Sequence, residues 1–305
     1  MTPVHCRRWL LCWVAVVTTA LAASASVRDP VPIPTLVVAF TPGMFAGVQV
    51  NDAKAAMDVW ARTVASSHGL DLTTSVEIYD NVEALGQAMD AGRAHVVVLS
   101  VGEYRRLRRP QFGSIMLGAR RGRHQEEFLL LVRAGRFQRV PDLRGRTLTT
   151  LEGTGHDMSL AWIDSVLLGE GLASAREYFG TVTSVSKPAR AVLPVFFEQR
   201  DACLTTRYGF ELMVELNPQL GTGLTVVASS PPMVHSLVVF DRRFSPANRD
   251  RVVMSLLALH ESPRGQQVLS LFGLDRLVEG TPADLAPALE LLARVDRLRS
   301  TKGQP

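Results

Sequence analysis

Short apolar runs alternate with segments of helical periodicity along nearly the whole chain, and this alternation limits the possible folds more than any other feature. The run Thr35–Phe40 indicates a buried strand, and the segment after it repeats apolar residues at helical spacing, at Ala53, Met57, Trp60 and Val64. Further strands are predicted at Thr73–Tyr79, Ala94–Ser100, Thr147–Leu151, Gly180–Thr183 and Ala202–Thr205. Strands that alternate with helices in this way are typical of an α/β protein.

Two places interrupt the alternation and are candidate crossovers between lobes. The basic stretch Arg120–Gln125 separates two apolar runs with no helix between them, and Pro231-Pro232 forces an extended backbone after another run. We therefore expect a bilobal fold of two α/β lobes joined by two crossover segments. Lobe I comprises residues 26–119 plus 232–305, and residues 120–231 form the inserted lobe II. The strand ends would face an interlobe cleft that binds the ligand.

The first residues have the organisation of a cleaved secretory signal. Arg7 and Arg8 precede the apolar stretch WLLCWVAVVTTALAA, and small residues allow cleavage after Ala22 or Ala25. An uncleaved anchor helix is the alternative, but the apolar stretch is short for a membrane span. We take residues 1–25 as a signal peptide and expect the protein to lie in the periplasm.

Removal of this signal changes the charge and the cysteine content. Lys plus Arg falls from 33 to 31 against 29 acidic residues, so the net charge falls from +4 to +2. A charge this small does not indicate nucleic-acid binding. Of the three cysteines only Cys203 remains, in the apolar run ACLTT, so no internal disulfide can form and a buried thiol is expected.

The loops that follow the predicted strands supply the candidate ligand-binding residues. Hydroxyls and backbone N–H groups dominate them, and such neutral donors can hold an oxyanion. The loop Gly153-Thr154-Gly155 leads from a strand to a helix start, where unpaired N–H donors and the positive end of the helix dipole favour an anion. The candidates are Thr41, Phe45, Tyr79, Asp80, Ser100, Tyr104, Thr154, Gly155, His156, Lys187, Thr205 and Tyr208.

Several candidates have a purely structural alternative. Asp80 or Asn81 can cap the helix that follows, and Thr154 can do the same for its own helix. The basic cluster within Arg120–His124 is more often a solvated turn than a binding site. These alternatives stay open on the sequence alone.

Motifs of metal or catalytic sites are missing from the sequence. The histidines at 68, 95, 124, 156, 235 and 260 show no HxxxH or HxH spacing, and one cysteine cannot complete a metal set. The chain has no G-x-S-x-G, P-loop or G-x-G-x-x-G match. We expect no metal, no cofactor and no enzymatic activity.

One stretch resembles a known family. VPDLRGRTLTTLEGTG, residues 140–155, is similar to the turn, strand and small-residue loop in the second lobe of periplasmic phosphate/phosphonate-binding proteins of ABC importers. The segment YDNVEALGQAMDAGRAHVVVLSVGEYRRL resembles the family's helix, strand and following tyrosine, and FFEQRDACLTTRYGFELM occupies the place of its next strand and helix. The resemblance covers nearly the whole chain after the signal.

The resemblance implies a type 2 periplasmic binding fold that traps a small anion by hinge closure without changing it chemically. The chain departs from the family at Gly153–His156, where a Ser-Thr-Ser-Gly type run is typical, and at Ser186-Lys187-Pro188, where Ser-His-Asp is typical. Lys187 either replaces lost hydroxyls as an oxyanion donor or is solvated.

The function we expect is capture of a phosphonate- or phosphate-like oxyanion, by a monomer, for the membrane permease of an ABC importer. The alternative is a periplasmic ligand-sensing module that reports to a membrane signalling partner. Nucleic acid is not an expected partner.

Overall fold

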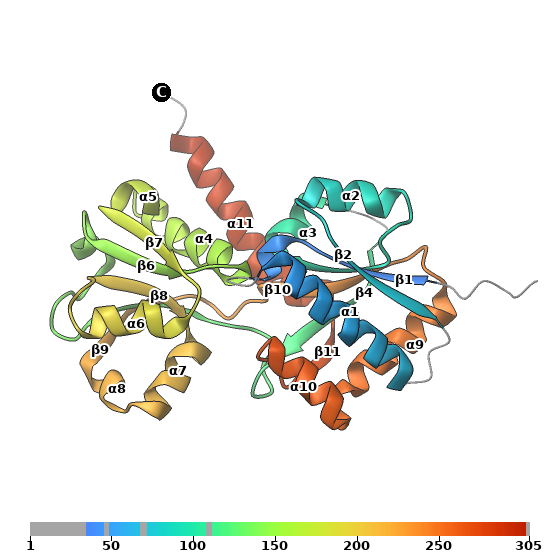
Figure 1. Cartoon of the computed structure of the whole chain (residues 1–305). Helices are drawn as coiled ribbons and strands as arrows, with labels where there is room; N and C mark the ends of the chain where they lie inside the picture. The colour runs from blue at the N-terminus through green and yellow to red at the C-terminus, as the bar shows by residue number, and fades with distance from the viewer. Residues whose placement is uncertain (1–34, 46–48, 68–71, 108–111, 303–305) are drawn as a thin grey trace, which may run out of the picture. The chain divides into compact units, whose positions relative to one another are not determined.

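The computed structural model describes residues 35–45, 49–67, 72–107 and 112–302, without the side chains of residues 67, 154–156, 271 and 302 (Figure 1). The predicted signal peptide, residues 1–25, lies outside these residues. Among the helices within the described ranges, none combines the length and the apolar character needed to cross a membrane.

A six-stranded sheet takes its strands from both ends of the described chain, in the order β11-β4-β10-β3-β1-β2 (Figure 1). Its strands are β1 (Thr35–Phe40), β2 (Thr73–Ile78), β3 (Val96–Ser100), β4 (Phe112–Ala119), β10 (Ser236–Asp241) and β11 (Arg276–Gly280). Strands β2, β1 and β3 are parallel, whereas β10 pairs antiparallel with both β3 and β4, and β11 pairs antiparallel with β4. The sheet is therefore mixed, and a late strand lies at its centre.

Side chains alternate between the two faces of this sheet, as the two-residue period of a strand requires. Leu36, Val38 and Phe40 of β1 join a buried cluster with α1, α9 and α10, and Ala39 joins a second cluster with α2, α3 and α11. These helices are α1 (Val50–Ser67), α2 (Val82–Asp90), α3 (Val101–Leu107), α9 (Pro246–Leu257), α10 (Pro263–Leu271) and α11 (Pro282–Lys302). Helices thus cover both faces.

The five-stranded sheet is built from the middle of the chain in the order β7-β6-β8-β5-β9. Its strands are β5 (Phe128–Arg133), β6 (Thr147–Leu151), β7 (Thr181–Val185), β8 (Ala202–Thr206) and β9 (Leu224–Ser229). In β5, Phe128 and Leu130 pack with α4, and Leu129 and Leu131 pack with α6. The helices around this sheet are α4 (Thr154–Gly169), α5 (Ala175–Tyr178), α6 (Pro188–Phe196), α7 (Arg207–Leu216) and α8 (Gln219–Gly223).

Two segments carry the chain from one sheet to the other and back. The first crossing segment is residues 120–127, between β4 and β5, and the second is residues 230–235, between β9 and β10. They lie side by side, because Glu126 and Met233 exchange backbone hydrogen bonds of 2.9 and 3.0 Å. Ser230 adds a further link, since its Oγ accepts from the N–H of Phe128 at 2.8 Å.

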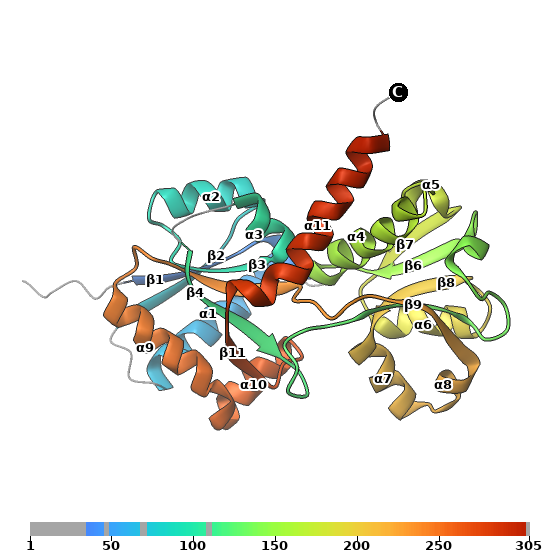
Figure 2. The same cartoon turned by 180° about the vertical axis from the view of Figure 1, so that it is seen from behind.

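The C-terminal helix adds a third link between the regions of the two sheets. Both regions belong to Ile33–Pro305, which forms one compact unit. α11 packs against α4 and α3, and both back and front views show it running along α4 (Figure 2). The predicted α/β class with two crossover segments is confirmed. The lobe boundaries at 26–119, 120–231 and 232–305 stay a prediction.

Three short elements were not predicted from the sequence. Strand β11 contains only two consecutive strongly apolar residues, Leu277 and Val278, between charged neighbours, and it lies at the edge of its sheet. Helices α5 and α8 are 4 and 5 residues long, too short to show a helical period. The tertiary contacts, rather than local patterning, define these elements.

Candidate ligand-binding site

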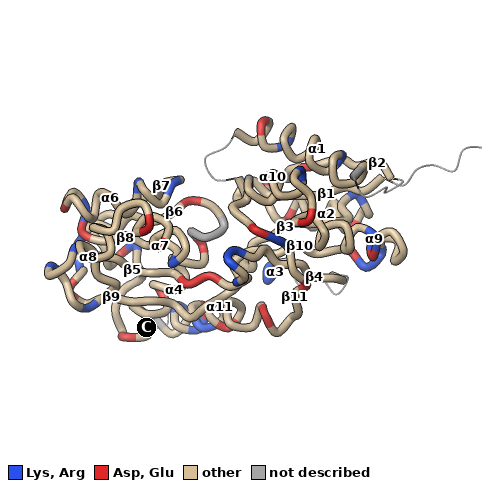
Figure 3. The backbone as a smooth tube through the Cα atoms, turned by 90° about the horizontal axis from the view of Figure 1, so that it is seen from below, with Lys and Arg blue, Asp and Glu red and all other residues tan. Residues whose placement is uncertain are grey.

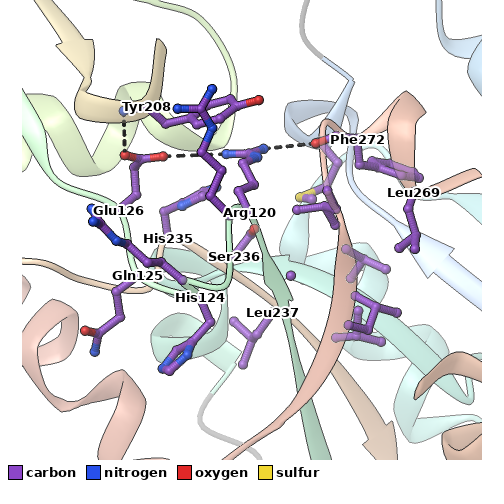
Figure 4. A pocket seen from close by; sticks show the side chains of 18 of the residues that line it. Arg120, His124, Gln125, Glu126, Tyr208, His235, Ser236, Leu237, Leu269 and Phe272 are labelled. Carbon is purple, nitrogen blue, oxygen red and sulfur yellow. Dashed lines mark hydrogen bonds and ion pairs between the residues drawn. The ribbon is translucent and has the colours of Figure 1, made fainter. Parts of the chain in front are cut away.

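A cavity of about 1140 Å³ lies beside the two crossing segments (Figure 4). Its wall includes the first crossing segment, the start of α7, and parts of β1, β3, β10 and α10. The volume slightly exceeds the roughly 300–1,000 Å³ of pockets that hold organic ligands of drug size. The second crossing segment contributes Pro232 and His235, so both crossings contribute residues to the wall.

A tight turn at residues 120–123 starts the first crossing segment. Arg120 and Arg123 exchange backbone hydrogen bonds of 2.8 and 2.9 Å. Between them Arg121 has φ 47° and Gly122 has φ 75°, the left-handed pair that two-residue hairpin turns need. Glycine suits the second position because it has no Cβ to clash. The turn therefore brings several basic side chains to one edge of the cavity.

Arg120 ties this turn to the end of α10. Its Nε donates to the Gly273 carbonyl at 2.6 Å and its Nη2 to the Phe272 carbonyl at 2.9 Å. Its Nη1 lies 3.7 Å from Oε2 of Glu126 (Figure 4). Three partners from two parts of the chain fix this guanidinium in the wall.

Tyr208 lies in the first turn of α7 and is surrounded by charge. Its backbone N–H donates to Oε1 of Glu126 at 3.2 Å. The guanidinium carbons of Arg120 and Arg121 lie 5.7 and 5.5 Å from its ring centroid, within reach of a cation–π interaction. Arg121 is itself held by Glu215, through two hydrogen bonds of 2.7 and 2.8 Å.

The charge of the cavity wall is mixed and slightly positive. Four arginines, at 120, 121, 123 and 207, stand against three glutamates, at 126, 127 and 211. Arg207 is paired with Glu127 at 2.7 Å. Within the described part of the chain, no ion pair or side-chain hydrogen bond is found for Arg123. Basic and acidic residues are otherwise interspersed along the elements of both sheets (Figure 3).

Burial moves the pKa of two groups in the wall in opposite directions. Desolvation raises the pKa of Glu126, while the Tyr208 N–H and Arg120 partly oppose this. Desolvation, assisted by the positive charge of Arg120, lowers the pKa of His235 to about 4. At neutral pH His235 is therefore a neutral imidazole at the cavity wall.

The structure places the candidate residues named from the sequence in several locations. Tyr208 lines the cavity. Phe45 and the exposed Lys187 are direct chain neighbours of the lining residues Met44 and Ser186.

Two predicted hydroxyls, Thr41 at the end of β1 and Thr205 near the end of β8, are buried. Their exposed fractions are 2% and 1%, and their Oγ1 atoms have no hydrogen-bond partner in the described residues. Neither residue belongs to the lining of this cavity. Both remain candidates for polar contacts that form only on ligand binding.

Four other candidates have structural surroundings outside the lining of this cavity. Ser100 bonds Glu103 at the start of α3, with both its N–H and its hydroxyl donating to Oε2 at 2.9 and 3.0 Å. Tyr104 stacks on Phe112 with ring centroids 5.1 Å apart. Tyr79 is partly buried, which raises its pKa, and Asp80 is exposed.

Helix α2 is capped by the neighbour of Asp80. The Asn81 side chain accepts from the Ala84 N–H at 2.8 Å, so of the two alternatives Asn81 is the cap.

The loop before α4 has the backbone geometry of a helix start. Gly153 occupies the N-cap position with φ 87°, a conformation that favours glycine, and the helix begins at Thr154. The side chains of Thr154 and His156, and the surroundings of Gly155, lie outside the described residues. Their role as anion ligands therefore stays a prediction.

Sequence reasoning missed Arg120, Glu126 and His235, which lie in the crossing segments rather than after parallel strands. The sequence did contain a signal for them. The charged stretch Arg120–Gln125 lies between two apolar runs with no helix between them, and it was predicted to be a crossover. Charge runs are usually solvated, and this expectation hid the role of Arg120, whose hydrogen bonds to the two residues after α10 are made across 152 and 153 residues.

Two mixed α/β sheets, joined by two crossing segments with a cavity beside them, define the fold of a type 2 periplasmic binding protein. Solved structures with this fold include the following three. A binding protein component of an ABC phosphonate transporter from Pseudomonas aeruginosa matches with a TM-score of 0.62 and 12% identity, over 89% of this chain and 90% of that one. PhnD1 from Prochlorococcus marinus, in complex with methylphosphonate, gives 0.60 and 15%, over 86% and 98%. A Xanthomonas citri protein bound to ATP gives 0.61 and 16%, over 87% and 98%.

The chain belongs to the family of periplasmic substrate-binding proteins of phosphonate ABC transporters, whose model matches residues 44–285. No curated protein gave a significant sequence match. Proteins of this family bind solutes for transport and are not enzymes. The described residues contain no group of three His, Cys, Asp or Glu side chains suited to a metal ion.

Proposed function

We propose that this protein captures a small oxyanion, of the phosphonate or phosphate class, in the cavity beside the crossing segments. It would do so in the periplasm, after removal of residues 1–25, and deliver the ligand to the membrane permease of an ABC importer. The family match and the fold support the transport role. The arginine-bearing wall supports an anionic ligand.

The observation that carries the proposal is the state of the four arginines in the wall. Arg120, Arg121 and Arg207 are held by carbonyl or carboxylate oxygens. Arg123 lines the same cavity, and no such partner is found for it among the described residues. A guanidinium has a planar set of donors that matches two oxygens of a phosphonate or phosphate, so Arg123 is the proposed primary contact.

Hydroxyl and backbone donors complete the proposed site when the hinge closes. The buried Oγ1 atoms of Thr41 and Thr205 have no partner in the described residues, and an unpaired buried hydroxyl costs free energy. Ligand oxygens reaching these donors would remove that cost. The remaining sequence candidates, Thr154 foremost, belong to the same proposal through the start of α4.

Titration calorimetry on the protein lacking residues 1–25 tests the proposal. We expect binding of methylphosphonate or inorganic phosphate, and a loss of roughly tenfold to a hundredfold in affinity for Arg123→Gln, since hydrogen bonds to charged groups contribute about 1.5–3 kcal/mol. Arg139→Gln is the control, because the Arg139 side chain is 76% exposed and lies outside the cavity lining. An absence of binding by every phosphonate, phosphate and sulfate tried would overturn the proposal.

The same cavity would serve a ligand-sensing module for a signalling partner. Co-purification of the protein, loaded with methylphosphonate, with its membrane partner separates the two roles. Transport predicts that the partner is an importer permease, and sensing predicts that it is a signalling protein.

A further inference from the structure

Two central residues of the six-stranded sheet are less buried than their position predicts. Val98 of β3 and Val238 of β10 are direct cross-strand partners. Their strand neighbours Val97 and Val239 have an exposed fraction of 0%, yet Val98 and Val238 are only partly buried and line the cavity. Central strands covered by helices are ordinarily buried on both faces. A hollow between the sheet and its covering helices leaves this pair uncovered.

Further apolar side chains border the same hollow. Met44, Trp60, Phe272 and Leu274 all line the cavity and all are only partly buried. They come from the 3-10 turn Pro42–Met44, from α1 and from the chain after α10. A smaller cavity of about 50 Å³ lies against it, sharing Trp60, Val98, Val238 and Leu277 with the main one. The apolar wall therefore continues toward the core.

Arg120 marks the boundary between this apolar wall and the charged wall. Its guanidinium donates to the carbonyls of Phe272 and Gly273 on one side and approaches Glu126 and Tyr208 on the other (Figure 4). The cavity thus has a polar end built from the crossing segment and α7, and an apolar end built from the six-stranded sheet. A bare tetrahedral anion would leave the apolar end in contact with water.

We infer that the ligand is an organic oxyanion with an apolar substituent of several carbon atoms. This inference rests on the proposed function, because the oxyanion contacts Arg123 at the polar end, where Tyr208 also lines the cavity. The substituent lies along Val98, Val238, Trp60 and Phe272. Exposed apolar surface of this kind is stabilised by covering it, and each buried methylene contributes about 0.8 kcal/mol, which is roughly fourfold in affinity.

A homologous series of alkylphosphonates tests the inference. Titration of methyl-, propyl- and hexylphosphonate should show affinity rising roughly fourfold per methylene, until the apolar end is filled. Equal affinity for all three would overturn the inference and leave the proposed function intact. Failure of all three to bind while inorganic phosphate binds would overturn the inference alone, and failure of inorganic phosphate and sulfate as well would overturn the proposed function itself. Binding of 1-hexanol as tight as that of hexylphosphonate would overturn the oxyanion role.

A filling variant and a matched control locate the substituent. Val98→Phe should weaken hexylphosphonate at least tenfold and leave methylphosphonate within twofold. Val226→Phe, at a 42% exposed position of β9 outside the cavity, should change neither. An equal loss for both ligands in Val98→Phe would contradict the placement.

Fluorescence gives a second measurement that does not depend on the folding of a filled variant. Of the four tryptophans, only Trp60 and Trp162 lie outside residues 1–25, and Trp162 is 3% exposed in the core. In a Trp162→Phe background, hexylphosphonate should shift the Trp60 emission to shorter wavelength, whereas methylphosphonate should not. An unchanged spectrum at saturating hexylphosphonate would overturn the placement.

Discussion

The carboxylate of Glu126 accepts a hydrogen bond from the backbone N–H of Tyr208, with 3.2 Å between Oε1 and N. This contact joins the first crossing segment to the first turn of α7, where unpaired N–H groups attract negative charge. The second carboxylate oxygen lies 3.7 Å from Arg120. A residue of the crossing segment thus occupies the anion-attracting end of a helix in the cavity wall.

The first prediction concerns Glu126→Gln. Burial raises the folded-state pKa of Glu126 above its ordinary value of 4.5, so the native protein binds more protons than the unfolded chain between these two values. Stability of the wild type therefore falls as pH rises through that window. The variant, which keeps an acceptor for Tyr208, should gain relative stability over the same window. Urea unfolding at several pH values measures the free energy of unfolding of the variant and of the wild type. A difference between the two that does not change with pH would contradict the raised pKa.

Replacement of His235 should act in the opposite direction. Its pKa is lowered from 6.5 to about 4, so on acidification the unfolded chain takes up the proton first. Wild-type stability falls as pH drops from about 6.5 to 4, by at most about 3 kcal/mol because the side chain borders the cavity. His235→Gln should reduce this loss. Thermal unfolding across pH 4–7 measures the stability of both proteins. Parallel curves of stability against pH for variant and wild type would refute the prediction.

Removing the buried carboxylate of Asp164 should destabilise the junction of α4 and α11. Asp164 is 5% exposed, accepts from the Ala175 N–H at 2.6 Å and pairs with Arg299 of α11. We expect Asp164→Ala to cost about 2–3 kcal/mol, because charged hydrogen bonds are lost in a buried position. Asp296→Ala is the matched control, since its side chain is 57% exposed and its pair with Arg105 should contribute below about 1 kcal/mol. Equal losses in chemical denaturation would contradict this ranking.

Cys203 should be unreactive in the native protein. Its side chain has an exposed fraction of 0%, and burial raises the pKa of its thiol well above the ordinary value. In protein lacking residues 1–25 we expect no labelling by a thiol reagent such as DTNB in buffer, and one thiol per chain in 6 M guanidinium. Fast labelling of the native state would show that strand β8 opens readily.

The strongest sequence patterns predicted their elements to the residue. Thr35–Phe40 and Thr147–Leu151 are strands with the predicted ends, because short runs of apolar and β-branched residues between turn residues leave little freedom. The helix predicted at Arg251–His260 is different, since α9 begins at Pro246 and ends at Leu257, and a 3-10 turn, Ala258–Glu261, follows it. Helical periodicity alone does not distinguish that turn from a further turn of α-helix.

The candidate site was less accessible to sequence reasoning. Tyr208 was named because it follows a predicted strand, and it lines the cavity. Arg120 and His235 come together only through the pairing of two segments more than a hundred residues apart, which no local pattern encodes. The exposure of Val98 depends on how far the covering helices stand from the sheet, and this too is a tertiary property.

The central place of β10 has a consequence for biosynthesis. Because β10 is hydrogen-bonded between β3 and β4, these two strands of the six-stranded sheet cannot be joined until the ribosome has synthesised residue 241. All strands of the five-stranded sheet are contiguous in sequence and precede that residue. A nascent chain can thus assemble its middle region early, while β3 and β4 wait for the strand that lies between them, as contacts of long sequence separation form slowly. Of the two sheets, the five-stranded one can therefore form first during synthesis.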